Sequence, residues 1–261
     1  MINRKIIDFH NHAFPKDIAQ KAIQQLEAAY LLDISNGGEY KDLIESAEAC
    51  NIYKMVVLSA AVNPMQVRPI NDWIASIDND KIIKFGAIHP DYENYKEEFS
   101  RIKSLGFKGI KLHPMFQNFV LDDKKLWPFY SDIDRDLIIL VHMGDYNTDA
   151  SAPKRLANVI DAFPHLKIVA AHFGGFDRWD EVEKYLVGKN LYFDTSSSLI
   201  LLSPEQAVRI IRNHGADKFV YGTDFPVSSH KEELERFLSL PLTDEERDMI
   251  LYKNAAKLLN L

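Results

Sequence analysis

The chain has 261 residues, of which 46% are apolar, and this is enough to bury a substantial core in one large domain. A formal net charge of -7, with no long run of lysine or arginine, argues against a general nucleic-acid or anionic-membrane binder. The one cysteine, Cys50, excludes an intramolecular disulfide. We expect a cytoplasmic protein, because we find neither a signal-peptide core nor an apolar stretch of the roughly 20 residues that span a bilayer.

Eight short apolar runs alternate with amphipathic stretches along the chain. The runs are dense in Ile, Val, Leu and Phe, as is typical of strands that are covered on both faces. Strands are predicted at 5–10, 54–60, 82–89, 107–113, 137–143, 167–172, 191–195 and 219–224. Helices are predicted at 18–31, 40–50, 92–105, 153–162, 181–186, 204–213 and 244–261.

This alternation predicts an α/β fold in which parallel strands are joined by right-handed helical crossovers. Eight strands close a (β/α)8 TIM barrel, whose usual length of about 250 residues this chain nearly equals. A doubly wound open sheet is the rival, but no G-x-G-x-x-G turn follows the first strand. We therefore expect one barrel domain over 1–261, with an elaborated first β-α connection that overhangs the site and a closing C-terminal helix.

Residues that bind metals stand where several of the predicted strands end. The first strand runs into Asp-Phe-His-Asn-His, where the alternation of side chains places His10 and His12 on one side. Later strands end at His142, His172 and Asp224. Because the carboxyl ends of barrel strands form the active site, these side chains are expected to gather at one rim. Imidazole and carboxylate donors in such a group predict a metal site.

With these motifs the chain resembles the metal-dependent amidohydrolase superfamily, and specifically the branch that includes enzymes similar to aminocarboxymuconate semialdehyde decarboxylase. The resemblance covers nearly the whole chain. It rests on DFHNH at 8–12, GIKLHP at 109–114, HMG at 142–144, AHFGG at 171–175, YGTDFP at 221–226 and NAAKLL at 254–259.

The resemblance implies that His10, His12, His142 and Asp224 hold one divalent ion, for which zinc is the first choice and manganese an alternative. A bound ion lowers the pKa of its water towards about 7. Asp224 can then bind the ion and accept a proton from that water. His172 is either a further ligand or a general base, and we favour the base because one ion is already satisfied without it.

Lys111 raises the question of a second metal, because binuclear members of the superfamily carry a carboxylated lysine that bridges two ions. Lys111 shares a face with His113 and is expected to point into the barrel. An unpaired buried charge is costly, so an ion pair with Asp8 or Asp194 is favoured over the bridging carbamate. Both interpretations stay open at this stage.

Five further residues are candidates for substrate binding. His89 and His113 end the third and fourth strands, and Arg68, Tyr146 and Arg178 fall in predicted β-α loops. An arginine would suit a small substrate that bears a carboxylate. Each of the five has an ordinary alternative as a hydrogen-bonded loop residue or a surface residue.

These observations favour a metal-dependent hydrolase in which activated water attacks an amide, a lactone or a related carbonyl centre. The first alternative is a non-oxidative decarboxylase that uses the same site, with His172 as the acid-base residue. The second is a metal-bearing binding protein without turnover. We expect a small-molecule substrate and neither nucleic acid nor membrane as a partner, and leave a homo-oligomer open.

Overall fold

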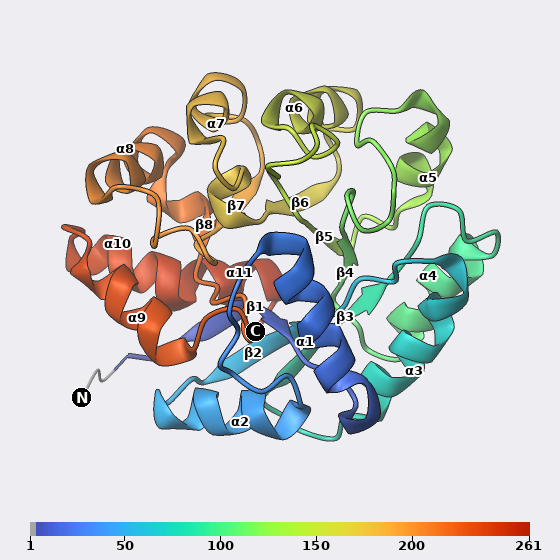
Figure 1. The fold of residues 1–261 in the computed structure, drawn as a ribbon. Helices are drawn as coiled ribbons and strands as arrows, with labels where there is room; N and C mark the ends of the chain where they lie inside the picture. The colour runs from blue at the N-terminus through green and yellow to red at the C-terminus, as the bar shows by residue number, and fades with distance from the viewer. Residues whose placement is uncertain (1–3) are drawn as a thin grey trace.

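The computed structural model describes residues 4–261, and their eight strands form one parallel sheet in chain order from β1 to β8 (Figure 1). Every neighbouring pair of strands is parallel. The strands are β1 Ile7–His12, β2 Lys54–Leu58, β3 Ile82–Ala87, β4 Gly109–Leu112, β5 Ile138–Val141, β6 Lys167–Ala170, β7 Tyr192–Asp194 and β8 Phe219–Val220.

Backbone hydrogen bonds between β1 and the segment that follows β8 close the sheet. The amide of Phe9 donates to the carbonyl of Tyr221 at 2.8 Å, and the amide of His12 donates to the carbonyl of Phe225 at 2.7 Å. The chain is therefore a (β/α)8 barrel, as the alternating pattern predicted.

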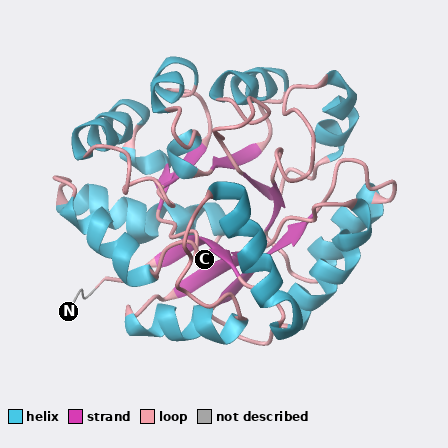
Figure 2. Ribbon diagram, in the orientation of Figure 1, coloured by secondary structure: helices cyan, strands magenta, loops and turns pink. Residues whose placement is uncertain are grey.

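Helices surround the strands in a ring (Figure 2). They are α1 Lys16–Tyr30, α2 Tyr40–Ala49, α3 Val67–Ser76, α4 Tyr95–Ser104, α5 Trp127–Asp132, α6 Pro153–Ala162, α7 Trp179–Tyr185, α8 Pro204–His214, α9 His230–Ser239, α10 Asp244–Asp248 and α11 Asn254–Leu259. Among the described residues, none of these helices is both long enough and apolar enough to cross a bilayer.

Alternate residues of regular strands such as β5 face two separate apolar cores. On β5, Ile138 and Leu140 belong to a cluster inside the barrel, whereas Ile139 and Val141 belong to the larger cluster between strands and helices. Ala255 and Leu259 of α11 also join the inner cluster. Burial on both faces explains why the strands read as dense apolar runs.

The first connection and the tail depart from the plain barrel. Between β1 and β2 the chain forms both α1 and α2, and α1 lies in front of the barrel opening in Figure 1. The tail was predicted as one helix over 244–261. Instead, the π-helical turn Met249–Lys253 joins α10 to α11, so the direction of the side chains shifts within it.

Candidate metal centre

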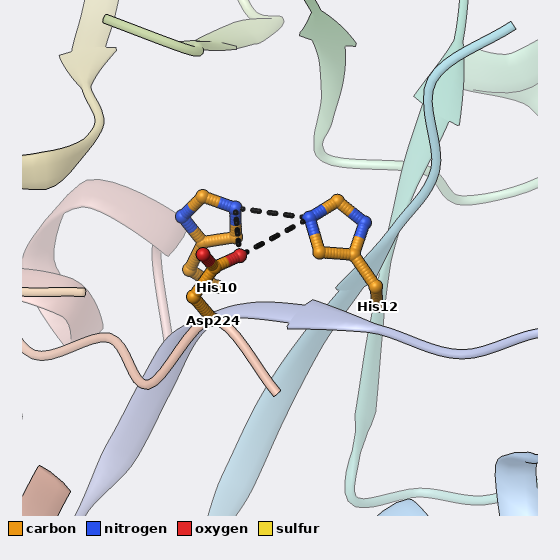
Figure 3. A group of neighbouring side chains, drawn as sticks. All are labelled: His10, His12 and Asp224. Atoms are coloured by element: carbon orange, nitrogen blue, oxygen red, sulfur yellow. Dashed lines mark hydrogen bonds and ion pairs between the residues drawn. The ribbon is translucent and has the colours of Figure 1, made fainter. Parts of the chain in front are cut away.

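Three donor atoms from opposite ends of the chain meet at the carboxyl-end rim of the barrel (Figure 3). Nε2 of His10 lies 3.2 Å from Nε2 of His12, and Oδ1 of Asp224 lies 3.4 Å from both nitrogens. Ligand atoms about 2.1 Å from one ion are roughly 3.0 Å apart at right angles and roughly 3.4 Å apart at the tetrahedral angle. The spacing of these atoms fits a single divalent ion.

A bulge in β1 turns His10 towards this group. Asp8 pairs with Met55 and Asn11 pairs with Val57, so two residues of β1 lie opposite the one residue of β2 between these partners. Such an extra residue breaks strict alternation. His10 consequently points into the barrel, while Asp8 accepts from the hydroxyl of Thr223 at 2.6 Å. Strict alternation along β1 would place Asp8 and His10 on one face, but Asp8 lies beside His230 of α9 on the outer face.

Carboxylate and hydroxyl groups orient two of the donors. Oδ2 of Asp194 lies 2.8 Å from Nδ1 of His10, which places the ring proton on Nδ1 and leaves Nε2 free for a metal. The hydroxyl of Ser197 donates to Oδ2 of Asp224 at 2.8 Å, so Oδ1 remains for the ion. These contacts match the usual carboxylate–histidine–metal arrangement.

The protonation states also suit a cation. Burial lowers the pKa of His10 well below its ordinary value, and the charge of Lys111 lowers it further. Burial likewise lowers the pKa of His12. Burial alone would raise the pKa of Asp224, but the neighbouring residues His10, His12 and His172 together hold it below the usual range. Neutral imidazoles and an ionised carboxylate are the forms that bind metals.

His142 and His172 form a pair beside the donor group. Nδ1 of His142 lies 3.0 Å from Nε2 of His172. The carbonyls of Gly144 and Ser196 lie 3.0 Å from Nε2 of His142 and 3.1 Å from Nδ1 of His172, and each of these nitrogens can donate its proton there. The two remaining nitrogens, Nδ1 of His142 and Nε2 of His172, then face each other.

This arrangement bears on two predicted roles. The three-residue donor group does not include His142, whose nitrogens face His172 and Gly144, so its role as a ligand stays a prediction. The ring of His172 lies 5.4 Å from that of His10, next to the donors. That position is compatible with the predicted base, which also stays a prediction.

Lys111 points into the barrel but forms no ion pair with Asp8 or Asp194 among residues 4–261. Its Nζ instead lies 3.0 Å from Nε2 of His10. Burial lowers the pKa of Lys111 to about 8, against the opposing charges of Asp224 and Asp194. The favoured ion pair is thus not found, because Asp8 faces outwards and Asp194 is engaged by His10. The bridging carbamate, which was the less favoured alternative, stays untested.

Residues 7–261 match the model of the family described as amidohydrolase. The chain belongs to the amidohydrolase family. The resemblance that the motifs indicated is therefore confirmed.

One named relative of this amidohydrolase and several proteins of the same fold are decarboxylases. Decarboxylase orsB of Emericella nidulans is 30% identical over 127 residues, which are 40% of this chain and 38% of that protein, so the match spans well under half of either. The fold is shared by the structure of 5-carboxyvanillate decarboxylase LigW from Sphingomonas paucimobilis, with a TM-score of 0.76 and 14% identity over 98% of this chain and 99% of that chain. It is also shared by 2,6-dihydroxybenzoate decarboxylase from Rhizobium (0.72, 18%, 98% and 99%). The same fold is found in dihydroxybenzoic acid decarboxylase from Polaromonas sp. JS666 with bound manganese and 2-nitroresorcinol (0.71, 18%, 99% and 97%).

Of the five predicted substrate contacts of this amidohydrolase, the structure brings His113 to the site. Its ring stacks on that of His142 at a centroid distance of 3.9 Å. The other four have different surroundings in the described chain. Nδ1 of His89 accepts from the amide of Asp91, Arg178 pairs with Glu181, Tyr146 is 55% exposed, and Arg68 is exposed on α3.

Tyr30, at the end of α1, is a site residue that the sequence pattern did not reveal. Its hydroxyl lies 3.2 Å from Nε2 of His113 and 3.4 Å from Nε2 of His142. No motif marks this tyrosine, because the helix that carries it belongs to the elaborated first connection. The expected overhang of that connection was the only signal for it.

Proposed function

We propose that this amidohydrolase is a metal-dependent, non-oxidative decarboxylase of a small carboxylic acid. The observation that carries this choice is the 30% identity with decarboxylase orsB. The decarboxylases among the solved structures of the same fold agree with it. The hydrolase that the motifs favoured finds no support in these names, and its alternative does.

The donor group suits this reaction because it gathers around one position. When bound by His10, His12 and Asp224, a divalent ion would supply a Lewis acid for an oxygen of the substrate. Manganese is the ion in the Polaromonas structure, and it accepts the mixed nitrogen and oxygen donors found here. Zinc, the first choice from the sequence, stays a prediction.

His172 would deliver the proton that decarboxylation requires. The bond between the substrate carbon and its carboxylate breaks, carbon dioxide leaves, and the electron pair remains on the substrate until that carbon takes a proton. Nε2 of His172 lies 3.0 Å from Nδ1 of His142, so a proton could pass between these two nitrogens. Asp194 holds the amide of His172 at 2.9 Å and fixes the backbone beneath the ring.

Product analysis with the manganese-loaded protein tests the proposal. Suitable acids are 5-carboxyvanillate and 2,6-dihydroxybenzoate, assayed beside a panel of lactones and amides. We expect one carbon dioxide per acid consumed and, in deuterated water, one deuterium on the carbon that lost it. Addition of water without carbon dioxide would restore the hydrolase, and absence of any turnover would favour the non-catalytic binding protein.

A further inference from the structure

Helix α1 lies over the opening of the barrel (Figure 1), and the chain just beyond it is hydrogen-bonded to the loop after β8. Figure 1 shows α1 in front of the strands. The last residue of this helix is Tyr30. Beyond α1 the chain turns back, and the side-chain amide of Asn36 donates to the carbonyl of Pro226 at 3.0 Å. Pro226 follows the donor Asp224 by two residues. The segment from α1 to Asn36 therefore contacts the loop after β8 as well as His113 and His142.

Packing alone does not account for the position of Tyr30. Ala19 is the only fully buried residue of α1, so the helix contributes little to the core. Leu31, the next residue, is 92% exposed. Tyr30 nevertheless turns its hydroxyl inwards, to within 3.2 Å of His113 and 3.4 Å of His142. Leu31 is left in water while the hydroxyl of the adjacent Tyr30 faces the site. This arrangement indicates a role for that hydroxyl.

The tyrosine is also held in the right form and orientation. Its ring meets the ring of Phe116 edge to face at 5.7 Å. A phenol is protonated at neutral pH, so the hydroxyl of Tyr30 keeps its ability to donate. Its two contacts are longer than the usual distance of about 2.9–3.0 Å between a nitrogen and an oxygen in a hydrogen bond, so they are weak and can be exchanged.

We propose that the hydroxyl of Tyr30 binds an anionic oxygen of the substrate, a carboxylate or a phenolate, and exchanges its contacts with His113 and His142 for that oxygen. The role rests on the proposed function, since it deepens the same site. Tyr30 would thus help to select substrates, because α1 places its hydroxyl where an anionic group of the substrate would bind.

The test compares Tyr30→Phe with the wild-type protein and with Tyr53→Phe, all loaded with manganese. Tyr53 precedes β2 at the opposite end of the barrel and is 38% exposed, so it is a matched loss of one hydroxyl. Two quantities are measured: KM and kcat for whichever acid is decarboxylated, and the Kd of 2-nitroresorcinol from its absorbance change.

We expect Tyr30→Phe to raise both KM and Kd by about 10- to 100-fold, the loss that corresponds to one hydrogen bond to a charged group. The kcat should change less than KM, and Tyr53→Phe should match the wild type. Unchanged KM and Kd in Tyr30→Phe would overturn the inference. So would a lower Tm and faster amide exchange in α1 without a change in KM or Kd, because that result indicates a purely structural contact.

The two readouts separate this inference from the proposed function. If the wild type binds 2-nitroresorcinol but releases no carbon dioxide from any acid, the function is wrong and Tyr30 is judged on Kd alone. If the wild type neither binds the probe nor turns over an acid, both proposals are overturned.

Discussion

Both ring nitrogens of His10 have polar neighbours at short distances. Asp194 holds Nδ1 at 2.8 Å, while Nε2 faces His12, Asp224 and Lys111. The ammonium of Lys111 thus stands next to the position that the donors offer to an ion. Two cations in a buried site repel each other strongly because little water screens them. The metal affinity of this protein is therefore expected to be limited by its own lysine.

Replacing Lys111 by methionine tests this expectation at the level of one charge. Lys111→Met keeps the length of the side chain and should bind Mn²⁺ about tenfold more tightly or better, as measured by calorimetric titration, because the repulsion is gone. Lys108→Met, on an exposed residue just before β4, is the control. Weaker binding by Lys111→Met would show that the lysine supports the ion instead, as a bridging carbamate would.

At the scale of elements, the loops after β5 and β6 hold His142 and His172 together by close backbone packing. The amide of Phe176 donates to the carbonyl of Met143 at 2.9 Å. Gly144 has a φ of +76°, and a Cβ there would lie 2.3 Å from the backbone of Phe176. A side chain at this position would force the two loops, and with them the two histidines, apart.

Gly144→Ala should therefore be far more disruptive than an alanine at an open glycine. Gly106 has a similar φ of +82°, but a Cβ added there would meet nothing within 4 Å, so Gly106→Ala should cost only about 1–2 kcal/mol of backbone strain. Overpacking should add about 1–3 kcal/mol more at Gly144. Urea unfolding measures both free energies, and equal losses would contradict the packing of the loops.

At the scale of the whole molecule, the sequence predicted the barrel because its signal is repeated eight times. Runs such as 137–143 are apolar on both faces, and that pattern depends only on burial. The bulge of β1 could not be predicted, because it depends on how Asp8 and Asn11 pair with β2. Strict alternation therefore placed Asp8 inside and gave Lys111 a partner that it does not have.

Site residues that stand in a local sequence motif could be predicted, whereas those placed by contacts between distant parts of the chain could not. His10, His12 and Asp224 stand in motifs at strand ends, and the structure brings their donor atoms together. The orientation of His142 depends on the carbonyl of Gly144 and on the ring of His172, which no spacing along the chain encodes. Tyr30 reaches the site from a helix that is outside the β-α repeat.

The metal content of the purified protein, saturated with Mn²⁺ and then desalted, measures most directly whether His10, His12 and Asp224 bind one ion. The wild type and His165→Asn, a histidine outside the site, should each retain one ion per chain. His12→Ala and Asp224→Asn should each lose it, because either change removes one of three mutually adjacent donor atoms. Full retention of the ion in both variants would contradict the metal centre on which the proposed chemistry depends.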